Sequence, residues 1–109
     1  MNFKVDRVNW QGHSSEIKSI REKVFICEYR IPRSSEFDNQ DLNCEHVLLR
    51  DEQGAPVATG RICTDGKISR IAVLIPHRTS NASQQVIKKL LAIAKDTGIK
   101  RVYIDSELT

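Results

Sequence analysis

Residues 67–97 read KISRIAVLIPHRTSNASQQVIKKLLAIAKDT and carry the strongest structural signal in the chain. Apolar residues over 67–74 predict a strand, which runs into the short Pro-His-Arg loop at 76–78. A predicted helix follows at once and opens with the small residues 81–83. A helix that begins at the end of a strand leaves backbone N–H groups without partners, at the positive end of the helix dipole. The stretch therefore predicts an anion site, suited above all to phosphate.

The size and composition of the chain indicate one globular domain over residues 1–109. Hydrophobic residues make up 39% and charged residues 28%, which is ordinary for a folded protein and argues against disorder. The net charge is only +3, and Lys and Arg are interspersed with Asp and Glu, which argues against a nucleic-acid partner. Because no apolar run approaches the length of a membrane span, we expect no membrane partner either.

The three cysteines Cys27, Cys44 and Cys63 are widely spaced, and the sequence contains no CxxC pair. The chain opens MNFKVDR, without an apolar signal region, so the pattern predicts a cytoplasmic protein with reduced thiols. Cys27 and Cys63 have apolar neighbours and are expected in the core. Since the histidines never fall into ligand spacing with the cysteines, we expect no metal site.

Periodicity and turn signals predict the remaining elements and the fold class. The predicted strands cover residues 3–8, 46–50, 57–63, 67–74 and 102–105, and the predicted helices cover 14–27 and 83–97. Residues 30–45 are interpreted as an irregular acidic loop, whose length favours either a short hidden helix or a functional loop. This order indicates an α/β (α+β) fold, a twisted mixed sheet of about five strands flanked by helices. The helix between the last two strands predicts that these two strands are parallel.

Two titratable residues are candidates for proton transfer. Glu28 follows an apolar helix end, where partial burial would raise its pKa and suit it to general-base catalysis. The alternative is a surface carboxylate, or an ion pair with Arg30 or Arg61. His46 begins a strand beside the acidic loop, where it either relays a proton or has a structural role.

The acidic loop concentrates four carboxylates, at Glu36, Asp38, Asp41 and Glu45. A charge cluster of this kind is usually a solvated face of the protein. The functional alternative is recognition of a cationic amine by the negative potential of the loop. Our interpretation favours the functional alternative.

Several motifs occur in a fixed order along nearly the whole chain. They are VFICEYRIP at 24–32, EFDNQD at 36–41, GRI at 60–62, DGKISRIAV at 65–73, PHR at 76–78 and GIKRVYID at 98–105. With these motifs the chain resembles the GNAT-type N-acetyltransferases, and in particular their small bacterial branch. The collinear order of the motifs makes the resemblance specific, although no single motif would suffice.

The resemblance implies that acetyl-CoA binds between two parallel strands that splay apart, which here end near Leu74 and Asp105. In that family the pyrophosphate lies on a loop whose opening Arg matches Arg78, while Asn81 and Ser83 occupy its two glycine positions. The strand backbone would hold the pantetheine arm, and the loop amides would hold the pyrophosphate. The implied cofactor-binding residues are Ile71, Ala72, Val73, Arg78, Thr79, Ser80, Asn81, Ala82 and Ser83.

Members of this family normally continue past the strand at 102–105 into a further helix and closing strands, which usually supply a general-acid tyrosine. We therefore expect an abbreviated domain, in which Tyr103 does not match that position, and a homodimer that covers the exposed strand edge. The implied function is N-acetyl transfer from acetyl-CoA to a small amine. The alternative is a non-catalytic remnant of the fold that acts as a binding or oligomeric interaction module.

Overall fold

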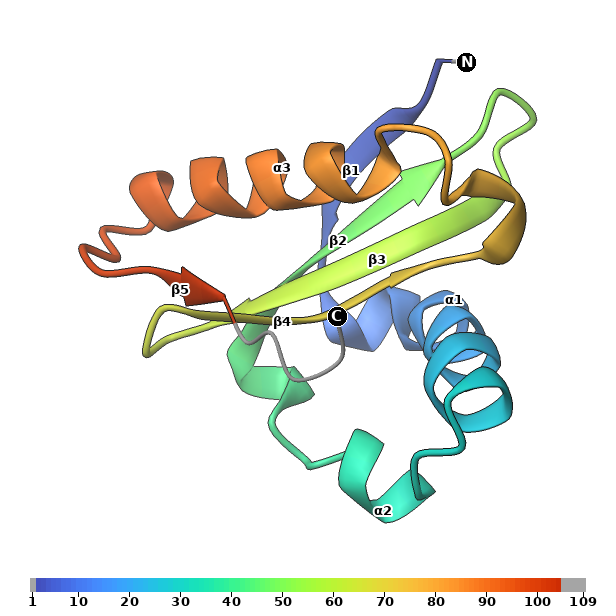
Figure 1. The fold of residues 1–109 in the computed structure, drawn as a ribbon. Helices are drawn as coiled ribbons and strands as arrows, with labels where there is room; N and C mark the ends of the chain where they lie inside the picture. The colour runs from blue at the N-terminus through green and yellow to red at the C-terminus, as the bar shows by residue number, and fades with distance from the viewer. Residues whose placement is uncertain (1, 105–109) are drawn as a thin grey trace.

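The computed structural model describes residues 2–104 as five strands and several helices around one sheet (Figure 1). The strands are β1 (Lys4–Val8), β2 (Cys44–Arg50), β3 (Pro56–Cys63), β4 (Lys67–Val73) and β5 (Tyr103–Ile104). The α-helices are α1 (Trp10–Arg21), α2 (Arg33–Glu36) and α3 (Ala82–Asp96). A π-helix, η1 (Glu22–Glu28), and two 3-10 turns, η2 (Asp41–Asn43) and η3 (Ile75–His77), complete the elements.

The five strands form one mixed sheet in the order β1-β2-β3-β4-β5. The first four pair antiparallel, whereas β4 and β5 pair parallel through Lys67 with Tyr103 and Ile68 with Ile104. The α+β fold class and the parallel final pair predicted from the sequence are therefore confirmed. Asp105, which the sequence places at the end of the last strand, lies outside the described residues.

Helices cover both faces of the sheet, and the side chains of the strands alternate between them. Figure 1 shows α3 over one face and α1 with η1 over the other. Two hydrophobic clusters form the core: the α3 cluster, which includes residues of α3, and the α1 cluster, which includes residues of α1. Along β2, Val47 and Leu49 belong to the α3 cluster, while Leu48 between them belongs to the α1 cluster. Since successive side chains of a strand point to opposite faces, a continuous apolar run can fill two cores at once.

The first predicted helix differs from the structure at both ends. It starts at Trp10, earlier than the predicted residue 14, because the side chain of Asn9 caps it by accepting a hydrogen bond from the Gly12 amide at 2.7 Å. Beyond Arg21 the chain continues as the π-helix η1. π-helical turns are rare and are found frequently at functional sites.

The structure confirms the predicted burial of Cys63, but the predicted reduced state of Cys44 and Cys63 and the predicted core position of Cys27 are wrong. A disulfide joins Cys44 to Cys63, because the antiparallel register of β2 and β3 places them directly opposite each other, with their Cα atoms 4.2 Å apart. Cys27 is a free and exposed thiol on η1, not a core residue. Within the described part of the chain, no helix is both long and apolar enough to cross a membrane.

Candidate functional site

A cavity of about 290 Å³ lies where the end of β4, the π-helix η1 and the start of α3 meet. Its lining residues are Val24, Phe25, Tyr29, Ile71, Val73, His77, Arg78 and Ser83. Four of them, Ile71, Val73, Arg78 and Ser83, are residues that the resemblance implied for cofactor binding. The structure therefore brings together the strand end and the helix start at one cavity.

The other implied binding residues do not line this cavity: Ala72, Thr79, Ser80, Asn81 and Ala82. Ala72 and Ala82 are buried, the first in the α1 cluster and the second in the α3 cluster. Asn81 precedes α3 and accepts a hydrogen bond from the side-chain amide of Gln85 at 2.7 Å. The cavity geometry therefore does not support a role for the side chains of these five residues. Binding of the cofactor by their backbone groups stays a prediction.

The first turn of α3 leaves two backbone amides unbonded. The Ala82 amide donates to the Ser80 hydroxyl at 3.3 Å, and the helical bonds begin with the Gln85 amide, which donates to the Asn81 carbonyl at 3.1 Å. Among residues 2–104, the amides of Ser83 and Gln84 have no acceptor. Because these donors lie at the positive end of a 15-residue helix that borders the cavity, they are suited to bind an anion, and the anion site itself stays a prediction.

Beyond its second residue, β4 has no strand partner on the side of β5 among the described residues. On its other side the pairing with β3 shifts register between Thr59 and Arg61, and Arg70 takes a positive φ of 56° opposite this shift. Non-glycine residues rarely adopt such a conformation. The bulge turns the Arg70 side chain toward α2, where it donates to the backbone oxygens of Ser35 and Glu36.

Glu28 ends η1 and forms an ion pair with Arg78 at the border of the cavity. Each carboxylate oxygen of Glu28 accepts a hydrogen bond from one terminal nitrogen of Arg78, and the Nε of Arg78 donates to the Val73 carbonyl at 2.9 Å. The bond with Arg78 lowers the pKa of Glu28, so the expected rise in pKa is wrong. The ion-pair alternative named Arg30 or Arg61, and the partner is neither of them. The role of Glu28 in proton transfer stays a prediction.

His46 is buried on β2, with 1% of its surface exposed, and does not line the cavity. Its Nε2 lies 2.9 Å from the backbone oxygen of Asp41, to which it donates, and its ring packs on Trp10 at 5.3 Å between centroids. Burial lowers the pKa of His46, which favours the neutral ring. Its Nδ1 has no partner among the described residues. The geometry favours the structural alternative for His46, and a proton relay stays a prediction.

Three carboxylates of the acidic loop lie in ion pairs with arginines, and two of them, Glu36 and Asp41, are buried. The buried charge cluster consists of Arg21, Arg61, Arg70, Glu36, Asp38 and Asp41. Within it, Arg21 lies 2.7 Å from Glu36 and 2.8 Å from Asp41, and Arg61 lies 2.7 Å from Asp38. Glu45, the fourth carboxylate, pairs with Arg7 at 2.9 Å on the surface. The interpretation of this loop as an amine-recognition surface is therefore wrong for the three clustered carboxylates.

Burial and pairing shift the pKa values of the cluster in opposite directions. For Glu36, burial outweighs the arginines and raises the pKa. For Asp41, burial acts to raise the pKa, but the hydrogen bonds of Arg21 and Arg61 outweigh it and lower the pKa overall. The hydrogen bond from Arg61 holds the pKa of Asp38 well below its usual range. The cluster thus holds three arginines against carboxylates of which Glu36 is the most easily protonated.

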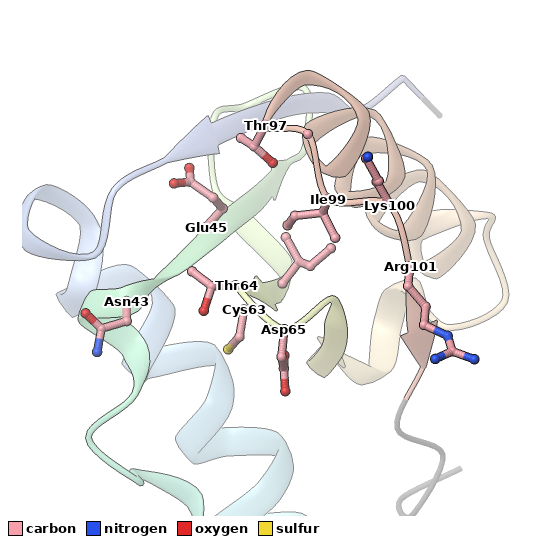
Figure 2. A pocket seen from close by; sticks show the side chains of 11 residues that line it. Asn43, Glu45, Cys63, Thr64, Asp65, Thr97, Ile99, Lys100 and Arg101 are labelled. Atoms are coloured by element: carbon pink, nitrogen blue, oxygen red, sulfur yellow. The ribbon is translucent and has the colours of Figure 1, made fainter.

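A larger pocket, about 550 Å³, lies at the opposite end of the sheet, between β2, the β3–β4 turn and the segment after α3. Figure 2 shows Glu45, Thr97 and Ile99 around it, while the Arg101 side chain extends away from them. Glu45 of the acidic loop lines it, but none of the predicted catalytic or cofactor-binding residues does, and no helix of residues 2–104 begins there. The smaller cavity is therefore the candidate site despite its size. Within residues 2–104, no group of His, Cys, Asp and Glu side chains is arranged to hold a metal ion.

Sequence reasoning missed part of the cavity wall. Phe25 of η1 and Tyr29, the residue that follows η1, line it and stack with their ring centroids 6.5 Å apart. Both belong to the motif VFICEYRIP, which was a signal of family resemblance only. Nothing in that motif predicts a π-helix, and it is the π-helix and the residue at its end that present these rings to the cavity.

No family model matches the chain, but it is similar in sequence to two proteins of Bacillus subtilis. It is 33% identical over 105 residues to the uncharacterized protein YyaT of Bacillus subtilis strain 168, covering 91% of this chain and 69% of that protein. It is 31% identical over 91 residues to the uncharacterized N-acetyltransferase YjcF of the same strain, covering 81% of this chain and 64% of that protein. The chain thus spans about two thirds of the length of these relatives.

Solved structures share the fold at low sequence identity. An acyl-CoA N-acyltransferase from Pseudomonas aeruginosa superposes with a TM-score of 0.81 at 19% identity, over 94% of this chain and 78% of that chain. The enzyme AAC(6')-Iy, in complex with the bisubstrate analog CoA-S-monomethyl-acetylneamine, gives a TM-score of 0.76 at 11% identity, over 99% of this chain and 82% of that chain. At these identities the likeness establishes a common fold.

Proposed function

Since this chain belongs to the GNAT-type N-acetyltransferase superfamily, we propose that it binds acetyl-CoA or a related acyl-CoA and transfers the acyl group to a small amine. The observation that carries the proposal is the cavity at the end of β4, where Arg78 and the unbonded amides of α3 meet. The fold is shared with AAC(6')-Iy, whose structure holds a CoA-containing bisubstrate analog. The compartment in which this would occur is proposed to be the cytoplasm.

The diphosphate would lie against the start of α3. The amides of Ser83 and Gln84 would donate to its oxygens, in a position where the helix dipole favours negative charge. Arg78 adds a guanidinium whose planar fork suits phosphate oxygens. Asn81 and Ser83 replace glycine in this loop, but the observed helix start keeps its donors free without glycine.

The pantetheine arm would follow the edge of β4. An extended chain of amides can pair with a strand edge as a peptide strand does. Ile71 and Val73 line the cavity from this edge, and Val24 and Phe25 form an apolar wall opposite them. The arrangement would lead the thioester from the helix start into the interior of the cavity, toward the bulge at Arg70.

The proposed chemistry is direct attack of the amine nitrogen on the thioester carbonyl, with the CoA thiolate as leaving group. Holding both reactants in one complex supplies positioning, and fixed donors supply electrostatic stabilisation. The ammonium form of the amine must first lose a proton. Of the two candidates, Glu28 borders the cavity and is ionised, whereas His46 is buried away from it. We therefore assign the acceptance of this proton to Glu28, directly or through water.

Calorimetric titration and thermal melting with CoA and acetyl-CoA test the proposal. A ligand at a hundred times its Kd adds about 2.7 kcal/mol to the unfolding free energy, which a melting curve detects readily. Release of free thiol from acetyl-CoA with a panel of small amines then tests transfer. Absence of any CoA binding would overturn the proposal.

The second candidate, a non-catalytic module that self-associates, has one observation in its favour. Tyr103 and Ile104 of β5 are about half exposed, at 48% and 49%, and exposed apolar edge strands are common sites of pairing with another chain. A homodimer formed through this edge is compatible with either function. Light scattering during gel filtration, combined with the CoA titration, separates a dimer that binds CoA from one that does not.

A further inference from the structure

The ion pair between Glu28 and Arg78 joins two segments that are 50 residues apart in the sequence. Arg78 and Tyr29, the residue after Glu28, both line the cavity, so the pair lies at its border. Both side chains are about one third exposed, at 28% for Glu28 and 32% for Arg78. Water and ligands can therefore reach both partners of this pair, unlike the pair of Arg21 and Glu36, of which 1% and 2% are exposed.

The geometry of the pair decides what Arg78 can offer to a ligand. Its two terminal nitrogens each donate to one oxygen of Glu28, and its Nε donates to the Val73 carbonyl. A carboxylate on a guanidinium in this two-point arrangement takes the same donor pair that two phosphate oxygens would take. Glu28 is thus an anion already bound at the position where the diphosphate of the ligand would meet Arg78.

From this arrangement, and resting on the acyl-CoA function proposed above, we infer that Glu28 is a built-in competitor of the ligand diphosphate for Arg78. Binding exchanges one anion for another on the same guanidinium. The exchange releases the Glu28 carboxylate at the cavity border only when a ligand is present. Glu28 therefore weakens the binding of acyl-CoA while it stabilises the empty protein.

A purely structural role makes a different prediction. If Glu28 only held Arg78 in place for the ligand, its replacement by glutamine would weaken both the fold and CoA binding. Competition predicts opposite signs, with a less stable empty protein and tighter CoA binding. The two readings are therefore separable by measuring both quantities on the same variants.

The chain offers a matched control at the other end of η1. Glu22, the first residue of η1, pairs with Arg33 at 2.8 Å, and neither residue lines the cavity. Glu22→Gln makes the same chemical change to an arginine-paired carboxylate of the same helix. The Kd of E22Q for CoA therefore shows how the loss of an ion pair of η1 affects binding when no competition for Arg78 is involved.

The experiment is calorimetric titration with CoA, and thermal melting without ligand, on the parent chain and on E28Q, E22Q, R78Q and E28Q/R78Q. We expect E28Q to lower the Kd for CoA by about two- to fivefold, the factor that a partly exposed ion pair represents. We expect its melting temperature to be no higher than that of the parent. E22Q should leave the Kd unchanged, and E28Q/R78Q should bind no tighter than R78Q, because the competitor has then lost its target.

If the parent chain binds CoA and a folded E28Q binds it no more tightly than the parent, the competition is overturned. The proposed function then still stands. Absence of CoA binding in every variant would overturn both. Should E28Q fail to fold, Glu28→Asp takes its place, since the shorter carboxylate cannot keep both bonds to Arg78. Tighter CoA binding by E28D than by the parent would then support the competition, and equal or weaker binding would overturn it.

Discussion

Two regions of this molecule with arginine–carboxylate pairs, the buried charge cluster and the border of the cavity, differ mainly in burial. In the buried charge cluster, Arg21 and Glu36 are almost fully shielded, with 1% and 2% of their side chains exposed. The pair of Glu28 and Arg78 has the same chemistry but is about one third exposed and borders a cavity. Removing one partner of a buried pair leaves a charge without compensation, whereas an exposed partner returns to water. The first region is therefore suited to hold the loop in place, and the second to exchange its partner.

The largest expected effect comes from breaking the buried region. Arg21→Ala leaves Glu36 and Asp41 buried with fewer positive partners, and we expect a loss of about 3–5 kcal/mol in the free energy of unfolding. Urea denaturation monitored by Trp10 fluorescence measures it. Arg33→Ala, which removes the partner of exposed Glu22, is the control and should cost far less. Comparable losses in the two variants would contradict the contrast between the regions.

The pH dependence of stability should follow the buried region too. The pKa of Asp38 and that of Asp41 are lowered in the folded chain, so their contribution is complete above the unfolded pKa near 3.8 and is lost as the pH falls below it. Glu36, whose pKa is raised, has the opposite sign and gains stability as it takes up its proton. We expect the unfolding free energy to fall below about pH 4 because two lowered groups oppose one raised group.

Asp38→Asn separates these contributions, since it removes the carboxylate with the lowest pKa and leaves the amide able to accept from Arg61. Urea denaturation between pH 3 and pH 7 should show a shallower acid decline for D38N than for the parent. An unchanged slope would mean that the acid sensitivity of the protein arises outside the cluster.

The smallest expected effect is on the exposed region and concerns ligand affinity alone. Asn81→Asp places a negative charge at the start of α3, where it should repel the diphosphate and weaken CoA binding by about fivefold. Stability should not fall, because Asp is as good a residue as Asn before a helix. Calorimetry on N81D, with N43D as a control for the same charge change at the opposite end of the sheet, tests it. Equal affinities of N81D and N43D for CoA would contradict the proposal that the diphosphate lies at the start of α3.

Local signals were enough to predict much of the fold and part of the site. The period of residues 67–74, the Pro-His-Arg loop and the small residues after it predict β4, the start of α3 and the place of Arg78 and Ser83. These features depend on neighbours in the sequence, which is why a sequence pattern contains them. The same is true of the turn at Gly66, whose φ of 90° suits glycine.

Partners that meet across the fold could not be predicted in the same way. Glu28 finds Arg78 only because the π-helix brings it beside the loop before α3, and Glu28 was assigned other candidate partners. From the sequence, the acidic loop was interpreted as solvated or as a ligand-recognition surface. Its arginine partners could not be predicted because they come from α1, β3 and β4. Likewise, the register of β2 against β3 decides which cysteines meet.

That register has a consequence for the integrity of the chain. The turn over residues 51–55 joins β2 to β3 and is largely exposed, so it offers a protease an accessible bond. A single cut there would leave the two fragments tethered through Cys44 and Cys63. Electrophoresis of such a nicked sample should show one full-length band without reductant and two shorter bands once dithiothreitol is added.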